Sequence, residues 1–299
     1  MKRLYTRLLL LLVAVTIISP SSSSCNKEAR RNGASVKKHT ALLSNRLAVD
    51  NLRMIVPSAS GINMSDEELL HFALAHPNDI TEAAKALKEA IQWRKTAGKH
   101  IVNAAQKAVA KAMKKSGWDD NVIRNAAPHA NVINDYITSK AVFSTSTEDG
   151  KIISVIRTSQ IDDKKLMDNA SVEQVRDYFL YNQEVTRIEA SKLSATTGRL
   201  YTVLNVSDVS GTRNAPDRRF TKAVALSCDK YESLYPSNVP VLAVNVPCAG
   251  VMRPFFPKSI QERLIFKKAP YLASLQELTP LGTDTSVRAK FVREIEGLV

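Results

Sequence analysis

Two apolar runs, residues 200–206 and 239–246, frame one amphipathic helix in the second half of the chain. Both runs are almost continuously apolar instead of alternating, which is typical of strands that are buried on both faces. A helix that connects two such strands forms a βαβ unit, and the strands of that unit lie parallel. The pattern therefore predicts an α/β fold with two parallel strands in its centre.

Alternating apolar positions predict a β-hairpin upstream of this unit. Residues 141–145 and 152–157 alternate, and Asp149-Gly150 between them is a typical hairpin turn. A capping box from Ser171 to Gln174 then begins a long helix that runs to about residue 194. The last periodic segment, residues 284–298, predicts a C-terminal helix that packs on the body of the protein.

The first half of the body has a helical period. Ser65 to Glu68 is a second capping box, so a helix is expected to begin near this point and to stop before Pro77. Another helix opens at Asp79, and a third covers residues 101–115, with isoleucine and alanine on its inner face and lysines on its outer face. These segments predict a helical subdomain in front of the α/β part.

The leader of the chain has the layout of a secretory signal peptide. A basic start precedes an apolar run of eleven residues, 8–18 (counting Thr16), and serines follow it. A helix that spans a bilayer takes about 20 apolar residues, so an uncleaved anchor is the less favoured interpretation. The sequence thus predicts entry into the secretory or endomembrane system, or into an organelle through a bipartite signal. The expected parts are a signal peptide, a disordered basic linker or transit segment, a helical subdomain and an α/β lipid-binding domain with a C-terminal helix, at residues 1–25, 26–60, 61–128 and 129–299.

The net charge of +13 is concentrated near the N-terminus. Residues 1–56 contain ten Lys/Arg and two acids, a net charge of +8, which leaves +5 for residues 57–299. A mildly basic body of this kind suits an anionic membrane surface, and we do not expect a nucleic-acid partner.

Motifs for catalysis or metal binding are missing from the sequence. All five histidines precede residue 130, so the α/β part has none for a Ser-His-Asp arrangement or a histidine metal site. Nucleotide-binding loops and the Gly-x-Ser-x-Gly elbow are also absent. The three cysteines, Cys25, Cys228 and Cys248, form neither a disulfide framework nor a zinc pattern. We expect a binding protein without cofactor or metal; an enzyme of unrecognised type is the alternative.

Several short motifs between residues 64 and 268 follow one another in a distinctive order. They are Glu68-Leu-Leu-His-Phe-Ala with Trp93-Arg94, the Glu148-Asp-Gly-Lys hairpin, Tyr235-Pro236, Asn245-Val-Pro247, and Arg253-Pro-Phe-Phe with Glu262-Arg263. This order resembles the CRAL-TRIO family, which includes phosphatidylinositol-transfer and tocopherol-transfer proteins. The resemblance implies a mixed β-sheet flanked by helices around a pocket for one lipophilic ligand. Only five residues, 248–252, separate the last two motifs, fewer than in relatives, which predicts a shorter gate over the pocket.

The apolar runs and the resemblance together nominate the residues of a ligand site. The candidates for lipid contact are apolar or aromatic, with ordinary core packing as the alternative role of each: Phe179, Tyr201, Val203, Phe220, Val251, Met252 and Phe255. Arg253 and Arg263 match positions that are basic in relatives. They are candidates for contact with a phosphate head group or an anionic membrane, with a plain surface charge as the alternative.

The function expected from the sequence is the binding of a hydrophobic lipid by a monomer, with transfer between membranes as a further step. Each buried CH₂ of an acyl chain contributes about 0.8 kcal/mol, so extraction of a lipid needs no covalent chemistry. Phospholipid, phosphoinositide, tocopherol-like, retinoid and sterol ligands all suit such a pocket. The alternative is a protein-interaction or membrane-recruitment module that keeps the fold without lipid transfer, and the short gate is compatible with it.

Overall fold

The computed structural model describes residues 42–57, 64–113, 119–147, 150–212, 216–234, 241–247, 249, 263–275 and 285–298. A five-stranded mixed sheet, in the order β1-β2-β3-β4-β5, forms its centre. The strands are β1 (Val142–Ser146), β2 (Lys151–Arg157), β3 (Thr202–Asp208), β4 (Val241–Val244) and β5 (Leu264–Lys267). Strand β1 pairs antiparallel with β2, and all other neighbours pair parallel. The predicted mixed α/β class, the hairpin and the central parallel pair β3–β4 are thus confirmed.

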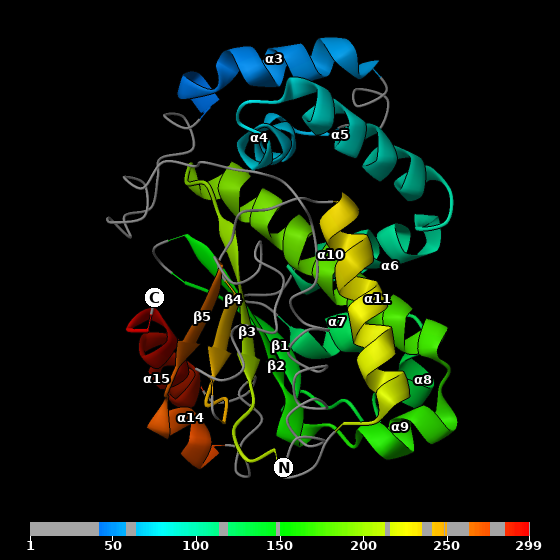
Figure 1. The fold of residues 1–299 in the computed structure, drawn as a ribbon, viewed down its shortest axis with the longest axis vertical. Coiled ribbons are helices and arrows are strands. Elements are labelled where there is room, and N and C mark those ends of the chain that lie inside the picture. Colours follow the sequence, from blue (N-terminus) through cyan, green and yellow to red (C-terminus); the bar gives the residue numbers. More distant parts are fainter. Residues whose placement is uncertain are drawn as a thin grey trace.

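Helices cover both faces of the sheet (Figure 1). Helices α10 (Val172–Thr197) and α11 (Arg218–Leu234) lie on one face and connect β2 to β3 and β3 to β4. The other face is covered by α14 (Pro270–Leu275) and α15 (Thr285–Glu296). Phe291 and Ile295 of α15 are fully buried against the sheet, which confirms that the C-terminal helix packs on the body.

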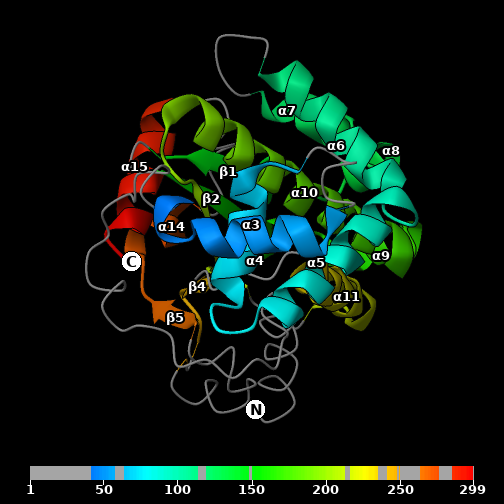
Figure 2. The same ribbon diagram turned by 90° about the horizontal axis from the view of Figure 1, so that it is seen from above.

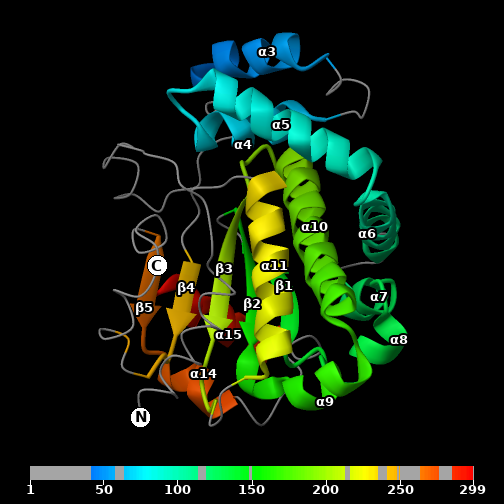
Figure 3. The same cartoon turned by 45° about the vertical axis from the view of Figure 1, so that its right-hand side comes forward.

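The remaining described helices lie beside α10 and at both ends of the helical layer (Figures 2 and 3). They are α3 (Arg46–Ile55), α4 (Asp66–Ala75), α5 (Ile80–Lys95), α6 (Lys99–Ala112), α7 (Asp120–Asn125), α8 (Ala130–Ile133) and α9 (Asp163–Asn169). Helix α6 packs along α10, and α3, α4 and α5 form a group that crosses the same end of α10 and α11. One large apolar core joins this group to α10 and α11.

Side-chain caps fix the helix starts that the sequence predicts. The Ser65 Oγ accepts a hydrogen bond from the Glu68 N–H at 3.3 Å, and the Glu68 carboxylate accepts one from the Ser65 N–H at 2.9 Å. Ser171 and Gln174 make the same reciprocal pair at the start of α10. Gly198 ends α10 with φ of 69°, in the left-handed region where glycine meets no steric cost.

Helix α3 lies inside the segment 26–60, for which the sequence predicts a disordered linker or a transit segment. The expectation of disorder is wrong for residues 46–55, because Val49 and Leu52 are buried against α4 and α5. The Arg53 Nη2 also lies 2.5 Å from the Asp66 Oδ1 of α4. Tertiary contacts therefore stabilise a ten-residue helix that has no side-chain cap at its start. The predicted signal peptide lies outside the described residues.

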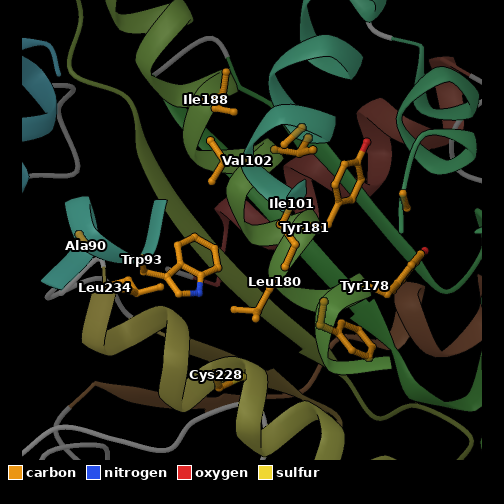
Figure 4. Packing of buried hydrophobic residues seen from close by; sticks show 14 of the residues in the cluster. Ala90, Trp93, Ile101, Val102, Tyr178, Leu180, Tyr181, Ile188, Cys228 and Leu234 are labelled. Carbon is orange, nitrogen blue, oxygen red and sulfur yellow. The ribbon is translucent and has the colours of Figure 1, made fainter. Parts of the chain in front are cut away.

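A buried tryptophan sets a steric limit at Gly98, between α5 and α6. Trp93 is 8% exposed within the helical core (Figure 4), and a Cβ on residue 98 would lie 2.3 Å from its Cε2. Gly98→Ala is therefore expected to lower the free energy of unfolding by about 1–3 kcal/mol, the usual cost of overpacking a core. Urea denaturation compares this variant with Gly297→Ala, where a Cβ would meet no atom closer than 3.4 Å. Equal midpoints for the two variants would contradict the steric argument.

Candidate functional site

Two adjacent cavities lie between the helical layer and the sheet. The first has a volume of about 80 Å³ and is bounded by α4, α10, β2, β3 and Tyr231 of α11. The second, of about 60 Å³, lies farther along the sheet between α10, α11 and the strands β1 to β4. Ser154, Gln183, Asn205 and Tyr231 line both cavities, so the two spaces are neighbours in one interface.

Short polar side chains on the sheet explain why this interface is hollow. Ser144, Ser154 and Asn205 are directly opposite one another on β1, β2 and β3. Ser154 lies on the face of β2 that carries Ile152 and Ile156, both of which pack toward the helices. A serine or asparagine in this row fills less space than the Val or Ile that is usual in a buried strand. The side chains of the helices do not fill the remaining space.

The structure brings several of the predicted lipid contacts to the cavity walls. Tyr201 and Val203 line the first cavity, and Phe179 and Arg263 line the second. Phe220 packs against Phe179 with ring centroids 6.0 Å apart, and it lines none of the cavities described here. The other predicted contacts, Val251, Met252, Arg253 and Phe255, lie outside the described residues.

A buried ion cluster borders the first cavity and joins α4 and α5 to α10. The Arg94 guanidinium lies 3.3 Å from the Glu68 carboxylate and 3.5 Å from that of Glu184. Arg187 pairs with the same two carboxylates, with Glu184 at 2.9 Å. Burial alone would raise the pKa of Glu68, but the Arg187 and Arg94 guanidiniums hold it below its usual value. Two cations and two anions thus neutralise one another at the cavity wall.

The α4 side of the first cavity also carries His71 and Glu67. Burial lowers the pKa of His71, and the nearby Arg187 guanidinium lowers it further. The imidazole is therefore neutral at pH 7. Sequence reasoning missed this charged and polar wall, although Glu67, Glu68 and His71 are spaced as neighbours on one side of a helix.

A protonated carboxyl group lies farther along α10. Glu189 is 3% exposed, and its Oε2 accepts a hydrogen bond from the Ser144 Oγ at 3.4 Å. Burial raises the pKa of Glu189 to about 8, and the negative charge of Asp120 contributes to the same shift. The carboxyl group therefore carries a proton at pH 7 and acts as a neutral polar group beneath the sheet.

A second polar cluster closes the carboxyl ends of the parallel strands. The Arg157 Nε at the end of β2 lies 3.3 Å from the Asp208 Oδ2 at the end of β3, and both side chains are fully buried. Asp208 accepts a further hydrogen bond from the Ser210 N–H at 2.9 Å. Asn245, after β4, adopts φ of 57° and bonds both the N–H and the carbonyl of Ala269. These contacts fix the strand ends to the segment that leads into α14.

Within the described ranges, no three or more His, Cys, Asp or Glu side chains gather where a metal ion would be held. None of the helices that the structure describes is both long enough and apolar enough to cross a bilayer. Comparison of the whole sequence with protein-family models and with curated proteins finds no match.

Proposed function

We propose that the protein binds a lipophilic molecule between its helical layer and its sheet, in the manner of CRAL-TRIO proteins. The observation that carries this proposal is the pair of adjacent cavities beneath α4, α10 and α11, whose walls include Tyr201, Val203 and Phe179. The parallel pair β3–β4 and the hairpin support the same resemblance. A concave, mostly apolar space with a few polar groups is the usual form of a small-molecule site.

The size of the cavities favours a single slender apolar chain. They measure about 80 Å³ and about 60 Å³, whereas pockets for drug-sized ligands occupy about 300–1,000 Å³. A phospholipid with two acyl chains does not fit this space without displacing a wall. A longer ligand therefore fits only if a lining element such as α4 moves away from the sheet.

The polar groups of the wall favour a ligand with a neutral polar end. Glu68 and Arg187 are engaged in the ion cluster, and Ser154, Gln183 and Asn205, which line both cavities, are neutral. The Gln183 Oε1 is buried, and it accepts no hydrogen bond from any described residue. A buried oxygen without a donor costs about 1–3 kcal/mol, which a ligand hydroxyl or amide would recover.

Lipid that co-purifies with the full chain tests the proposal. We expect native mass spectrometry of protein from lipid-replete cells to show one bound lipophile for each chain, and solvent extraction to release it for identification. Protein from the same cells without any bound molecule would contradict the proposal.

A filling variant assigns such a molecule to the cavity. Ser191 of α10 lines the first cavity, and a phenylalanine side chain at this position would fill it. Ser191→Phe is therefore expected to remove most of the lipid that co-purifies with the protein. Ala195→Phe on the same helix is the matched control, because Ala195 is exposed and lines none of these cavities. Equal lipid content in the two variants would place the molecule elsewhere.

A second candidate function is a protein-interaction or membrane-recruitment module with a contracted pocket. The small volume of the first cavity, about 80 Å³, is the observation that favours it. This alternative predicts that the protein purifies without lipid and still binds its partner after Ser191→Phe.

A further inference from the structure

Helix α3 has a buried face and an exposed apolar face. Val49 and Leu52 are buried against α4 and α5. Leu47 and Met54 are 75% and 77% exposed, and their spacing of seven residues places them together on the opposite side of the helix. Leu43, just before α3, and Ile55, at its end, are exposed as well. Helix α3 and the turn before it thus hold four of the seven large apolar side chains that are exposed in the described part of the chain.

The exposed face lies at the outer end of the molecule. Figures 1 and 3 both show α3 beyond α4 and α5, at the end opposite α9. Among the described elements, α3 packs against α4 and α5 through its inner side. The outer face is therefore open to a flat partner without rearrangement of the core.

The charges of α3 itself are balanced by ion pairs. Arg46 lies 2.9 Å from Asp50 and 3.3 Å from Asp66, and Arg53 lies 2.5 Å from Asp66. The sequence immediately before the helix is different, because residues 26–41 contain five Lys/Arg and one acid. An apolar helix face thus directly follows a strongly basic stretch of sequence.

We propose that the outer face of α3 docks on an anionic phospholipid membrane. Leu47 and Met54 enter the boundary between head groups and acyl chains, while the basic stretch 26–41 attracts the anionic head groups. One weak anchor gives only marginal binding, whereas an apolar face combined with a basic cluster supplies two signals that add. This docking does not depend on the ligand in the cavity.

A second copy of the chain fits this face less well than a membrane does. A stable contact between two proteins buries about 800 Å² on each partner, and a stripe of a few side chains falls short of that area. In a symmetric dimer the basic stretches of both copies would also approach one another and repel. An anionic membrane provides an apolar interior for the exposed side chains of α3 and negative charge for the basic stretch.

A local fluorescence measurement on the full chain tests the proposal. Leu47→Trp adds an indole to the outer face, and vesicles of phosphatidylcholine and phosphatidylserine with brominated acyl chains quench an indole that enters them. We expect the added emission to shift to shorter wavelength and to be quenched, more strongly with phosphatidylserine than with phosphatidylcholine alone. The control Lys165→Trp, on exposed α9 at the other end of the molecule, is expected to show neither change.

The same measurement separates the competing outcomes. If the chain binds vesicles only through its leader, position 47 stays unquenched and the proposal is overturned. A blue shift that grows with protein concentration in the absence of vesicles indicates a second copy on this face and also overturns it. In support of docking, Leu47→Asp with Met54→Asp is expected to weaken vesicle binding about tenfold or more, because each change removes an apolar side chain that the membrane would bury.

Discussion

Replacing Glu189 by Gln is expected to remove a loss of stability that the wild-type protein shows between about pH 4.5 and pH 8. Burial raises the pKa of Glu189 to about 8 in the folded protein, from an ordinary value of 4.5. Between these two values the unfolded chain releases the proton while the folded chain keeps it. The free energy of unfolding therefore falls as the pH rises, by about 1.4 kcal/mol per pH unit and on the order of 5 kcal/mol over the whole window. Stability from this group is complete below pH 4.5 and lost above pH 8.

The neighbours of Glu189 act in both directions, and burial remains the largest effect on its pKa. Asp120 raises its pKa, while the Ser144 hydroxyl and the Arg288 guanidinium lower it without cancelling the effect of burial. Glutamine is neutral at every pH and keeps an oxygen that accepts from Ser144, so the variant loses the pH dependence and not the contact. Urea denaturation at several pH values measures how the free energy of unfolding depends on pH. Glu82→Gln, at an exposed carboxylate on α5, is the control that should keep the wild-type slope. An unchanged slope in Glu189→Gln would contradict the assignment.

Replacing Arg187 by Met is expected to lower the free energy of unfolding by about 3–5 kcal/mol, the usual effect of removing one partner from a buried ion pair. Glu68 and Glu184 share the guanidiniums of Arg94 and Arg187. In the variant, the Glu68 and Glu184 carboxylates share the single remaining cation, Arg94. Both carboxylates are largely buried, so water does not replace the lost guanidinium. Because the cluster ties α4 to α10, the loss should also loosen the cover of the first cavity.

An exposed pair provides the control for this measurement. Arg219 pairs with Asp168 and with Asp217, each at 2.8 Å, and the side chains of Arg219 and Asp168 are about half exposed. Arg219→Met is expected to shift the urea midpoint much less than Arg187→Met does, because solvent screens such pairs. The double variant Glu184→Gln with Arg187→Met should recover part of the loss, since it removes the unpaired buried charge. A loss for Arg187→Met that equals that of the surface control would show that the cluster is solvated.

The elements with strong local signals were predictable from the sequence. Two capping boxes, at Ser65 and Ser171, begin helices where the residues indicate, and the continuous apolar runs form the parallel pair β3–β4. Helix α3 was missed because its burial depends on two residues, Val49 and Leu52, and on ion pairs to Asp66 of another helix. The helical spacing of Val49, Leu52 and Val56 was a signal, but it stands at the end of a basic, polar segment whose composition favoured a linker.

The candidate site was predictable only in its apolar part. Tyr201 and Val203 stand in a buried strand, so their place on a cavity wall follows from their type and position. Gln183 and Arg187 were missed because polar residues on a long helix are usually solvated. One signal was available, since Asn205 interrupts an apolar strand and marks the row where the sheet leaves space. The volume of the cavities depends on how the helices pack and has no counterpart in the sequence.

The most direct test of the central claim is a crystal structure of the protein purified without removal of lipid. We predict continuous, elongated electron density between α10 and the sheet, in contact with Tyr201 and Val203 and near the Gln183 amide. Separate water peaks in a space of the present size, or side chains that fill it completely, would contradict the binding of a lipophilic ligand.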